Sequence, residues 1–281
     1  MSKDQLKRFI EEALQEDIGS GDHTTLACIP ADARGKAVLL AKQEGILSGT
    51  RVAAEVFKAF DPGLSIELYM SDGSPVKSGD RPLIVSGRQQ SILQTERIVL
   101  NIIQRMSGIA TLTAQFVERV KGTGARILDT RKTTPNMRFL EKEAVRTGGG
   151  FSHRAGLYDM ILIKDNHVDY AGGIVQAVTR ATDYVRTTGL PLKIEVEART
   201  LEDVRKILDT GGVFRILLDN FTPGRILEAV ELIGGRVETE ASGGITLENV
   251  RDYALTGVDY ISVGALTHHI RCLDFSLKAT T

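Results

Sequence analysis

Short runs of alternating apolar and polar residues fill the first hundred positions of the chain, with glycine and proline between them. Residues 35–44 and 82–87 show the alternation that is typical of half-buried β-strands. Apolar residues recur at helical spacing in residues 1–19 and 89–120, and the second pattern is interrupted near Ser107–Gly108. The pattern predicts an α+β domain before about residue 108, with the long helical segment as its connector to the rest.

From about residue 124 the pattern changes to short apolar runs that alternate with amphipathic stretches. We expect six β-strands, within residues 125–130, 159–165, 192–197, 215–220, 236–244 and 259–265. Helical spacing is clear at residues 201–209, 223–232 and 247–255. A strand followed by a helix, repeated along the chain, predicts βα units and a parallel sheet.

The spacing of the strand ends helps to decide whether this sheet forms a barrel or an open sheet. Glu197, Asp219, Ser242 and Gly264 each end an apolar run, and they follow one another at steps of about 22 residues. Units this compact favour a (β/α) barrel, whose active site is built at the C-terminal ends of the strands. Only about six strands are clear, so an open doubly wound sheet is the alternative architecture. Both architectures bind ligands at the same ends of the strands.

Charge and composition exclude several classes of protein. The chain of 281 residues has 35 Lys+Arg against 36 Asp+Glu, so it lacks the basic excess of most nucleic-acid-binding proteins. Its apolar runs are far shorter than the ~20 residues that span a bilayer. The N-terminal segment lacks the apolar core of a signal peptide. We therefore expect a cytoplasmic protein that binds neither nucleic acid nor membrane.

The sequence also lacks the common signatures of organic cofactors and structural metals. It contains no GxGxxG fingerprint, no Walker A pattern, and no HExxH or paired CxxC motif. Cys28 and Cys272 lie far apart and are more typical of inert thiols than of a disulfide. We expect no organic cofactor and no tightly bound zinc.

Positively charged side chains gather at the predicted strand ends. Arg131 and Lys132 follow the first strand of the repeat, Lys164 follows the second, and His153 and Arg154 lie between them beside three glycines. Arg presents a planar pair of donors to carboxylate and phosphate oxygens, and Lys adds a compact charge. These cations would repel one another unless anions lay between them. The set predicts a site for anionic substrates, and the alternative is a group of solvated charges paired with neighbouring carboxylates.

Glycines occupy the last two predicted strand ends. Residues 242–244 are Ser-Gly-Gly, and residues 263–265 are Val-Gly-Ala. Barrels frequently bind phosphate at the loops after their last strands, where glycine lets backbone N–H groups approach the anion. We expect a phosphate group to bind at these two loops.

Two acidic residues end neighbouring strands opposite the cations. Glu197 and Asp219 could bind ribose hydroxyls, hold Mg²⁺ together with water, or stabilise positive charge that develops on a sugar. The alternative is that they orient the lysines. Glu195 lies two positions before Glu197, on the same side of its strand, and could share the task.

Longer motifs recur in order along nearly the whole chain. They are EDIGSGDHTT (16–25), TERIVLNIIQRMSGIAT (95–111), DTRKTTP (129–135), AVRTGGGFSHRAGLYDMILIKDNH (144–167), EVE (195–197), LLDN (217–220), EASGGI (240–245) and GVDYISVGALTH (257–268). In this order they resemble the quinolinate phosphoribosyltransferase family, also called nicotinate-nucleotide pyrophosphorylase (carboxylating). The first motif departs from the family pattern at His23, where an aliphatic residue is expected.

The resemblance implies an α/β fold with two domains. An N-terminal α/β sandwich domain is expected at residues 1–107, with residues 266–281 packing on it, and an incomplete, open α/β barrel at residues 108–265. The resemblance further implies a homodimer, or a higher assembly of dimers, in which one subunit covers the active site of the other.

The resemblance also implies a reaction. Quinolinate attacks C1 of 5-phosphoribosyl-1-pyrophosphate, pyrophosphate leaves, and loss of CO2 gives nicotinate mononucleotide in de novo NAD biosynthesis. The phosphoribosyltransferase family requires Mg²⁺ together with the pyrophosphate substrate. Mg²⁺ is held by Glu197 and Asp219 or only through that substrate, and the sequence leaves both arrangements open.

The family motifs assign a role to each candidate residue. Catalytic roles fall to Lys132, Glu197 and Asp219. Quinolinate is surrounded by Arg131, His153, Arg154, Lys164 and, from the neighbouring subunit, Arg97. The phosphoribosyl substrate lies near Thr130, Lys132, Glu197 and Asp219, and its 5-phosphate lies at Ser242, Gly243, Gly244, Val263, Gly264 and Ala265.

Two other functions are consistent with the same residues. One is a related enzyme that uses a monocarboxylate such as nicotinate, but such a substrate would not require all the predicted cations. The other is a non-catalytic phosphate- or nucleotide-binding barrel, which would gain nothing from the carboxylates of Glu197 and Asp219 beside its anions.

Overall fold

The computed structural model describes residues 3–280, which fold into two compact units. The first unit contains the residues up to Ala114, residues 134–149 and the residues from His269 onward. The second contains Gln115–Thr133 and Gly150–His268. Each unit has its own sheet, so each is described by itself.

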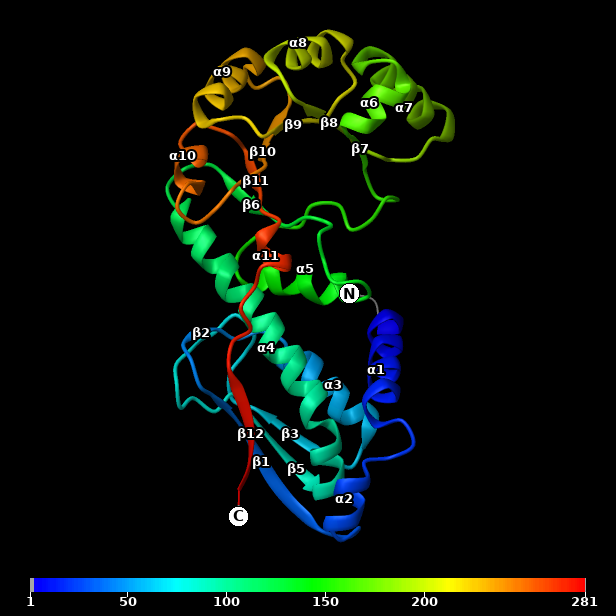
Figure 1. Ribbon diagram of the computed structural model, residues 1–281, viewed down its shortest axis with the longest axis vertical. Helices are drawn as coiled ribbons and strands as arrows, with labels where there is room; N and C mark the ends of the chain where they lie inside the picture. Colours follow the sequence, from blue (N-terminus) through cyan, green and yellow to red (C-terminus); the bar gives the residue numbers. More distant parts are fainter. Residues whose placement is uncertain (1–2, 281) are drawn as a thin grey trace. The chain divides into compact units, whose positions relative to one another are not determined.

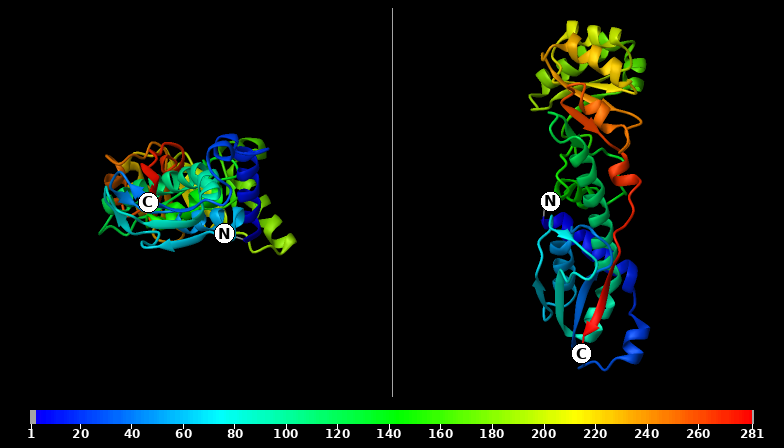
Figure 2. Two further views of the ribbon diagram at one scale, coloured as in Figure 1. Left: turned by 90° about the horizontal axis from the view of Figure 1, so that it is seen from below. Right: turned by 90° about the vertical axis from the view of Figure 1, so that its left-hand side faces the viewer.

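The first unit is built on an antiparallel sheet (Figure 1). Its elements are α1 (Lys3–Ile18), α2 (His23–Cys28), β1 (Arg34–Ala41), β2 (Gly45–Ile46), α3 (Thr50–Phe60), β3 (Ser65–Leu68), β4 (Pro75–Val76), β5 (Leu83–Arg88), most of α4 (Gln89–Arg119), α5 (Arg138–Thr147) and β12 (Phe275–Thr280). The strand order is β12-β1-β5-β3, and β2 pairs with β4 in a separate ribbon. Strand β12 lies along β1 in both views, although almost the whole chain separates them in sequence (Figures 1 and 2).

A row of leucines across three strands forms the core of this sheet. Leu277 pairs with Leu39, and Leu39 pairs with Leu83, so their side chains share one face. The exposed fraction of each is 6% or less. Val56 and Phe57 of α3 are fully buried in the same unit. Burying each such side chain contributes about 1.5–3 kcal/mol, which is why the alternation in these strands predicts their position correctly.

Helix α4 is continuous, so the interruption predicted near Ser107–Gly108 is wrong. Ser107 Oγ accepts a hydrogen bond from Ser48 N (2.9 Å) and donates one to Ser48 O (3.1 Å). A Cβ added to Gly108 would collide with the backbone oxygen of Arg271. The two small residues thus let other backbone segments approach the helix. Neither α4 nor any other helix within residues 3–280 is both long and apolar enough to cross a membrane.

The second unit is a parallel α/β sheet covered by helices. Its elements are β6 (Arg126–Leu128), β7 (Ile161–Ile163), α6 (Asp165–Ala171), α7 (Ile174–Thr188), β8 (Ile194–Ala198), α8 (Leu201–Thr210), β9 (Arg215–Asp219), α9 (Pro223–Ile233), β10 (Glu238–Ser242), α10 (Val250–Ala254), β11 (Tyr260–Ser262) and α11 (Ala265–His268). Each of the six expected segments contains a strand, and all strand pairs are parallel.

The strand order identifies this sheet as an open barrel. It runs β6-β11-β10-β9-β8-β7, so β7 to β11 are neighbours in chain order, without the reversal that defines a doubly wound sheet. Figure 1 shows helices α6 to α10 following one another around the outside of these strands. In the described chain β6 and β7 are the two edges of the sheet. The predicted fold class, an N-terminal α/β domain plus an incomplete α/β barrel, is confirmed.

Helix caps fix the loops that follow two central strands. Thr200 accepts a hydrogen bond from Asp203 N (3.1 Å), and Asp203 Oδ2 accepts one from Thr200 N (2.9 Å), which starts α8 directly after β8. The side chain of Thr222 accepts a hydrogen bond from Arg225 N (3.5 Å) at the start of α9, and Pro223 occupies the first turn. Both residues satisfy backbone N–H groups at the start of a helix. The loops at the ends of β8 and β9 are therefore short and well defined.

Residues 134–149 belong to the first unit, whereas the sequence placed them within the barrel domain. Arg105 of α4 donates from Nε (2.8 Å) and Nη2 (2.6 Å) to Oε1 of Glu141, which is fully buried. Glu141 Oε2 accepts a hydrogen bond from Thr134 N (3.2 Å). This charged contact attaches the segment to α4. The division into compact units therefore differs from the expected limits at residues 107 and 265, and the division between Ala114 and Gln115 falls inside α4.

A substitution at Gly108 tests the close packing of α4. In an open helix Gly→Ala stabilises by about 1 kcal/mol. Here we expect Gly108→Ala to lower the free energy of unfolding by about 1–3 kcal/mol, because the new methyl group meets the backbone of Arg271 and Cys272. Gly124→Ala is the control, since no atom lies within 4 Å of its added Cβ. Urea unfolding measures both, and equal stability of the two variants would contradict the close contact.

Candidate active site

A pocket of about 660 Å³ lies at the C-terminal ends of the parallel strands. All the predicted site residues except Arg97 line it, and they are Thr130, Arg131, Lys132, His153, Arg154, Lys164, Glu197, Asp219, Ser242, Gly243, Gly244, Val263, Gly264 and Ala265. They belong entirely to the second unit. Arg97 is an exposed residue of α4 in the first unit and does not line this pocket. The structure thus brings together residues that are spread over about half of the sequence.

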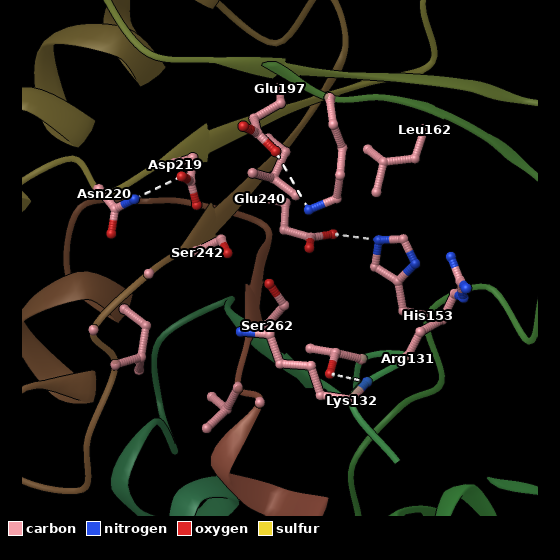
Figure 3. Close-up of a pocket in the computed structure, with 18 of the residues that line it drawn as sticks. Arg131, Lys132, His153, Leu162, Glu197, Asp219, Asn220, Glu240, Ser242 and Ser262 are labelled. Atoms are coloured by element: carbon pink, nitrogen blue, oxygen red, sulfur yellow. Dashed lines mark hydrogen bonds and ion pairs between the residues drawn. The ribbon is translucent and has the colours of Figure 1, made fainter. Parts of the chain in front are cut away.

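The cations occupy one side of the pocket. Figure 3 shows Arg131 and His153 on one side, with Glu197 and Asp219 across from them. Burial lowers the pKa of the Arg154 guanidinium, and the positive charge of Arg131 lowers it further. Arg154 Nη1 also donates to the backbone oxygen of Met160 (3.3 Å). The guanidinium groups of Arg131 and Arg154 repel each other in a partly buried environment, and binding of an anion between them would be favourable.

The carboxylates occupy the other side. Lys164 Nζ lies 3.5 Å from Glu197 Oε2, and Asn220 Nδ2 donates to Asp219 Oδ2 (2.6 Å). Burial raises the pKa of Glu197, the charges of Asp219 and Asp165 raise it further, and Lys164 lowers it. Glu197 and Asp219 therefore repel each other across adjacent strand ends. A divalent cation with oxygen ligands, or a positively charged sugar carbon, would relieve that repulsion.

Glycine is required by geometry in the loops that end β10 and β11. Gly243 has φ +93°, and a Cβ there would collide with Oδ1 of Asn220. A Cβ on Gly264 would lie 2.9 Å from His268 Nε2 and 3.1 Å from Lys132 Cδ. Gly244 has φ +64°, and its added Cβ would meet nothing within 4 Å. All three glycines line the pocket, so backbone of both loops faces it, as a phosphate site needs.

A buried network of charged side chains lies at the floor of the pocket, and the sequence analysis largely missed it. It consists of His153, Glu195, Arg215 and Glu240. His153 Nε2 lies 3.0 Å from Glu195 Oε2 and 3.5 Å from Glu240 Oε2. Arg215 Nη1 donates to Glu240 Oε2 (2.9 Å). The sequence left open that Glu195 shares the task of Glu197, but Glu195 lies two positions earlier in β8 and contacts His153 instead.

A sequence signal for this network exists. Strand β8 is buried at all five positions, yet carries Glu at two of them, and β10 also carries Glu two positions apart. Residues two apart in a strand face the same side. In strands that are mostly buried this spacing predicts a polar interior, and Arg215 on the strand between them is the counterion.

Burial perturbs the two carboxyl groups of the network. Burial raises the pKa of Glu240 to about 7, and Glu195 raises it too, while His153 and Arg215 lower it. Burial likewise raises the pKa of Glu195 to about 7, and Arg215 opposes the effect. His153, Glu195 and Glu240 offer possible metal-ligand atoms within 4.8 Å of one another. However, the guanidinium of Arg215 already compensates their charge, which disfavours a cation at this position.

The chain is similar to proteins of one family over nearly its full length. The family model described as the N-terminal domain of quinolinate phosphoribosyl transferase matches residues 22–107, and the model for the C-terminal domain matches residues 109–278. The quinolinate phosphoribosyltransferase [decarboxylating] 2b, mitochondrial, of Nicotiana tabacum is 45% identical over 291 aligned residues, which cover 98% of this chain and 82% of the relative.

Bacterial proteins give the same result. The probable nicotinate-nucleotide pyrophosphorylase [carboxylating] of Bacillus subtilis (strain 168) is 41% identical over 276 aligned residues, which cover 98% of this chain and 94% of the relative. The crystal structure of NadC from Streptococcus pyogenes superposes with a TM-score of 0.94 at 37% identity, and the match covers 100% of this chain and 98% of that one. Sequence and fold therefore agree on a single family.

The buried carboxyl pair predicts how stability depends on pH. Glu195 and Glu240 have pKa values raised from the usual 4.5 to about 7, so between these pH values the folded chain binds more protons than the unfolded chain. The free energy of unfolding should then fall as the pH rises through this window, by roughly 3 kcal/mol for each carboxyl group that holds a proton in the folded chain. In Glu195→Gln the fall should be smaller. Urea unfolding at pH 5, 6, 7 and 8 measures it.

The control for this prediction is Glu231→Gln, which removes an exposed carboxylate of α9. Its pH dependence should match that of the unmodified protein. If Glu195→Gln also left the pH dependence unchanged, the buried pair would not be the group that takes up the proton.

Proposed function

This chain belongs to the quinolinate phosphoribosyltransferase family, and we propose that the pocket at its strand ends performs the reaction of that family. The 5-phosphoribosyl group passes from its pyrophosphate to the ring nitrogen of quinolinate, and pyrophosphate, CO2 and nicotinate mononucleotide are the products. The observation that carries this proposal is the arrangement of cations on one side of the pocket and two carboxylates on the other. The reaction requires both, because an anionic nucleophile attacks a carbon that becomes positive.

Quinolinate would bind on the cationic side. It carries two adjacent carboxylates, and Arg131, Arg154 and Lys164 offer charged donors from three neighbouring loops. A dianion between Arg131 and Arg154 would offset their mutual repulsion. A monocarboxylate such as nicotinate would leave part of this charge without a partner, which favours the dicarboxylate substrate.

The phosphoribosyl donor would bind along the other side and the glycine loops. Its 5-phosphate fits the exposed backbone of residues 242–244 and 263–265, and Lys132 lies beside Gly264. Glu197 and Asp219 would then face the ribose. As the bond from C1 to pyrophosphate lengthens, positive charge develops on the sugar, and fixed carboxylates stabilise it.

The residues present fit Mg²⁺, which we propose as the metal of this reaction. Glu197 and Asp219 provide oxygen ligands close enough for mutual repulsion to contribute to the raised pKa of Glu197. They would hold the ion either directly or through the pyrophosphate substrate. The ion would neutralise the charge of the leaving pyrophosphate.

Decarboxylation needs little further from the protein. Once the ring nitrogen is bonded to ribose, it carries a positive charge and can accept the electron pair of the breaking bond between C2 and the carboxylate. CO2 leaves, and C2 takes up a proton from solvent. The side chains mainly hold the reactants in place and balance charge, so no covalent nucleophile is required.

We further propose a homodimer, or an assembly of such dimers, with shared active sites. Arg97 is exposed and does not line the pocket of its own chain, so it is available to a second copy. No nucleic-acid or membrane partner is proposed. The cytoplasm remains the expected compartment, although the name of the Nicotiana relative includes the word mitochondrial.

Turnover with purified components tests the proposed reaction. With quinolinate, the phosphoribosyl donor and Mg²⁺, we expect nicotinate mononucleotide, which is followed by chromatography. Arg131→Ala and Lys164→Ala should each lower kcat/KM for quinolinate by about 100-fold, as the loss of charge-assisted hydrogen bonds implies. Lys206→Ala, which removes an exposed lysine paired with Glu202, is the matched control and should not change it. Turnover of nicotinate in place of quinolinate would contradict the proposal.

Mixing two inactive variants tests the shared site. Arg97→Ala and Lys164→Ala each damage every site of their own homodimer, but one of the two sites in a mixed dimer retains both side chains. At equal concentrations about a quarter of the normal activity should return, since half of the dimers are mixed. Mass spectrometry of the mixture establishes whether subunits exchange. Exchange without recovered activity would show that Arg97 does not act in trans.

A further inference from the structure

The imidazole of His153 uses both of its nitrogens inside the protein. Nδ1 accepts the backbone N–H of Arg154 (2.7 Å), so the proton of the neutral ring lies on Nε2. Nε2 lies 3.0 Å from Glu195 Oε2 and 3.5 Å from Glu240 Oε2, both within ion-pair distance, and the dashed line in Figure 3 marks the contact with Glu240. With both nitrogens engaged, the ring is poorly placed to bind the substrate directly.

We propose that Glu195 and Glu240 are positioning residues, which hold the imidazole of His153 in one tautomer and orientation so that the adjacent Arg154 is presented to the substrate carboxylates. This inference rests on the proposed function, because it assigns the two glutamates a part in quinolinate binding. It changes the role of His153 from a direct ligand to the link between a buried support and a binding arginine.

The backbone at His153 is fixed independently of its side chain. Its N–H donates to Oδ1 of Asp129 (2.8 Å), and Asp129 is fully buried directly after β6. The loop is therefore held at its backbone by one buried carboxylate and at its imidazole by two others. Arg154 follows directly, so its Cα position is set by these contacts.

The carboxylates are themselves held firmly in place. Arg215 lies opposite Glu195 on the neighbouring strand and donates from Nη1 to Glu240 (2.9 Å). Its guanidinium lies 4.1 Å from the ring centre of Tyr260, and Nη2 donates to Glu238 (2.8 Å). Glu195 and Glu240 are fully buried, whereas the side chain of Glu238 is 37% exposed. A support with so little freedom keeps a binding side chain in position before substrate arrives.

Steady-state kinetics of three variants test the inference. Glu195→Leu removes the carboxyl group nearest to Nε2 and should raise KM for quinolinate about tenfold, the effect of losing one buried polar contact. KM for the phosphoribosyl donor and kcat should each change by less than about threefold, because the damage is limited to the quinolinate side. Glu195→Gln keeps a polar oxygen beside Nε2 and should retain most of the affinity that Leu loses. Glu238→Gln, which alters a contact to the same Arg215 without reaching His153, is the matched control.

A double-mutant cycle shows whether Glu195 acts through His153. In a His153→Ala background, Glu195→Leu should change KM for quinolinate by less than about twofold, because the link is already broken. Equal losses in both backgrounds, or equal effects of Leu and Gln, would overturn the proposal and leave Glu195 with a general structural role. If Glu195→Leu does not fold, Glu240→Leu takes its place in the same cycle, and Glu240→Gln is its conservative counterpart.

A spectroscopic measurement does not depend on the reaction. In protein labelled with ¹⁵N-histidine, the signals of His153 are identified by their loss in His153→Ala. We expect a neutral ring protonated at Nε2. A proton on Nδ1 in the free protein would overturn the inference, whether or not quinolinate is the substrate. Failure of the unmodified protein to turn over quinolinate would instead refute the proposed function alone.

Discussion

Charged groups that are removed from water must be balanced by other charged groups, and this requirement organises the parallel sheet of the second unit. The strands carry Glu195, Glu240 and Arg215 into a region from which solvent is excluded. Each carboxylate there would be costly alone, and the single guanidinium between them makes the arrangement tolerable only in one geometry. The same geometry determines where His153 points. The position of the pocket residue His153 therefore depends on the charge balance among these buried side chains.

The same need for charge balance applies at the C-terminal strand ends, where solvent reaches the side chains. Arg131 and Arg154 face Glu197 and Asp219 across a space that the protein itself does not fill, and Lys164 lies against Glu197. The opposite charges of Lys164 and Glu197 offset each other at a distance of 3.5 Å. Arg131 and Arg154 both carry positive charge and repel each other. Substrates with a negatively charged ring and a sugar that becomes positive complete the balance. The site is thus complementary to a reacting pair rather than to either reactant alone.

Much of this arrangement could be predicted from the sequence, because strand ends in a parallel sheet converge. Glu197 and Asp219 end apolar runs at a regular interval, which is enough to place them side by side. The pairing of Arg215 with Glu240 could not be predicted in this way, since the register of neighbouring strands is set by packing across the whole sheet. The continuity of α4 at Gly108 was also missed, because only the three-dimensional approach of Arg271 explains a glycine inside a helix. Similarly, the contact between Arg105 and Glu141 depends on residues 36 positions apart.

The pairing of β12 with β1 has a consequence for the order of events during synthesis. Lys36 and Thr280 are partners in one antiparallel ladder, so the sheet of the first unit lacks its edge strand until residues 275–280 have left the ribosome. By then the entire parallel sheet has been translated. The segment that comes first in the chain is thus among the last to be completed, and until then β1 presents an open edge to which other nascent chains could add. A long-range contact of this kind favours slow folding.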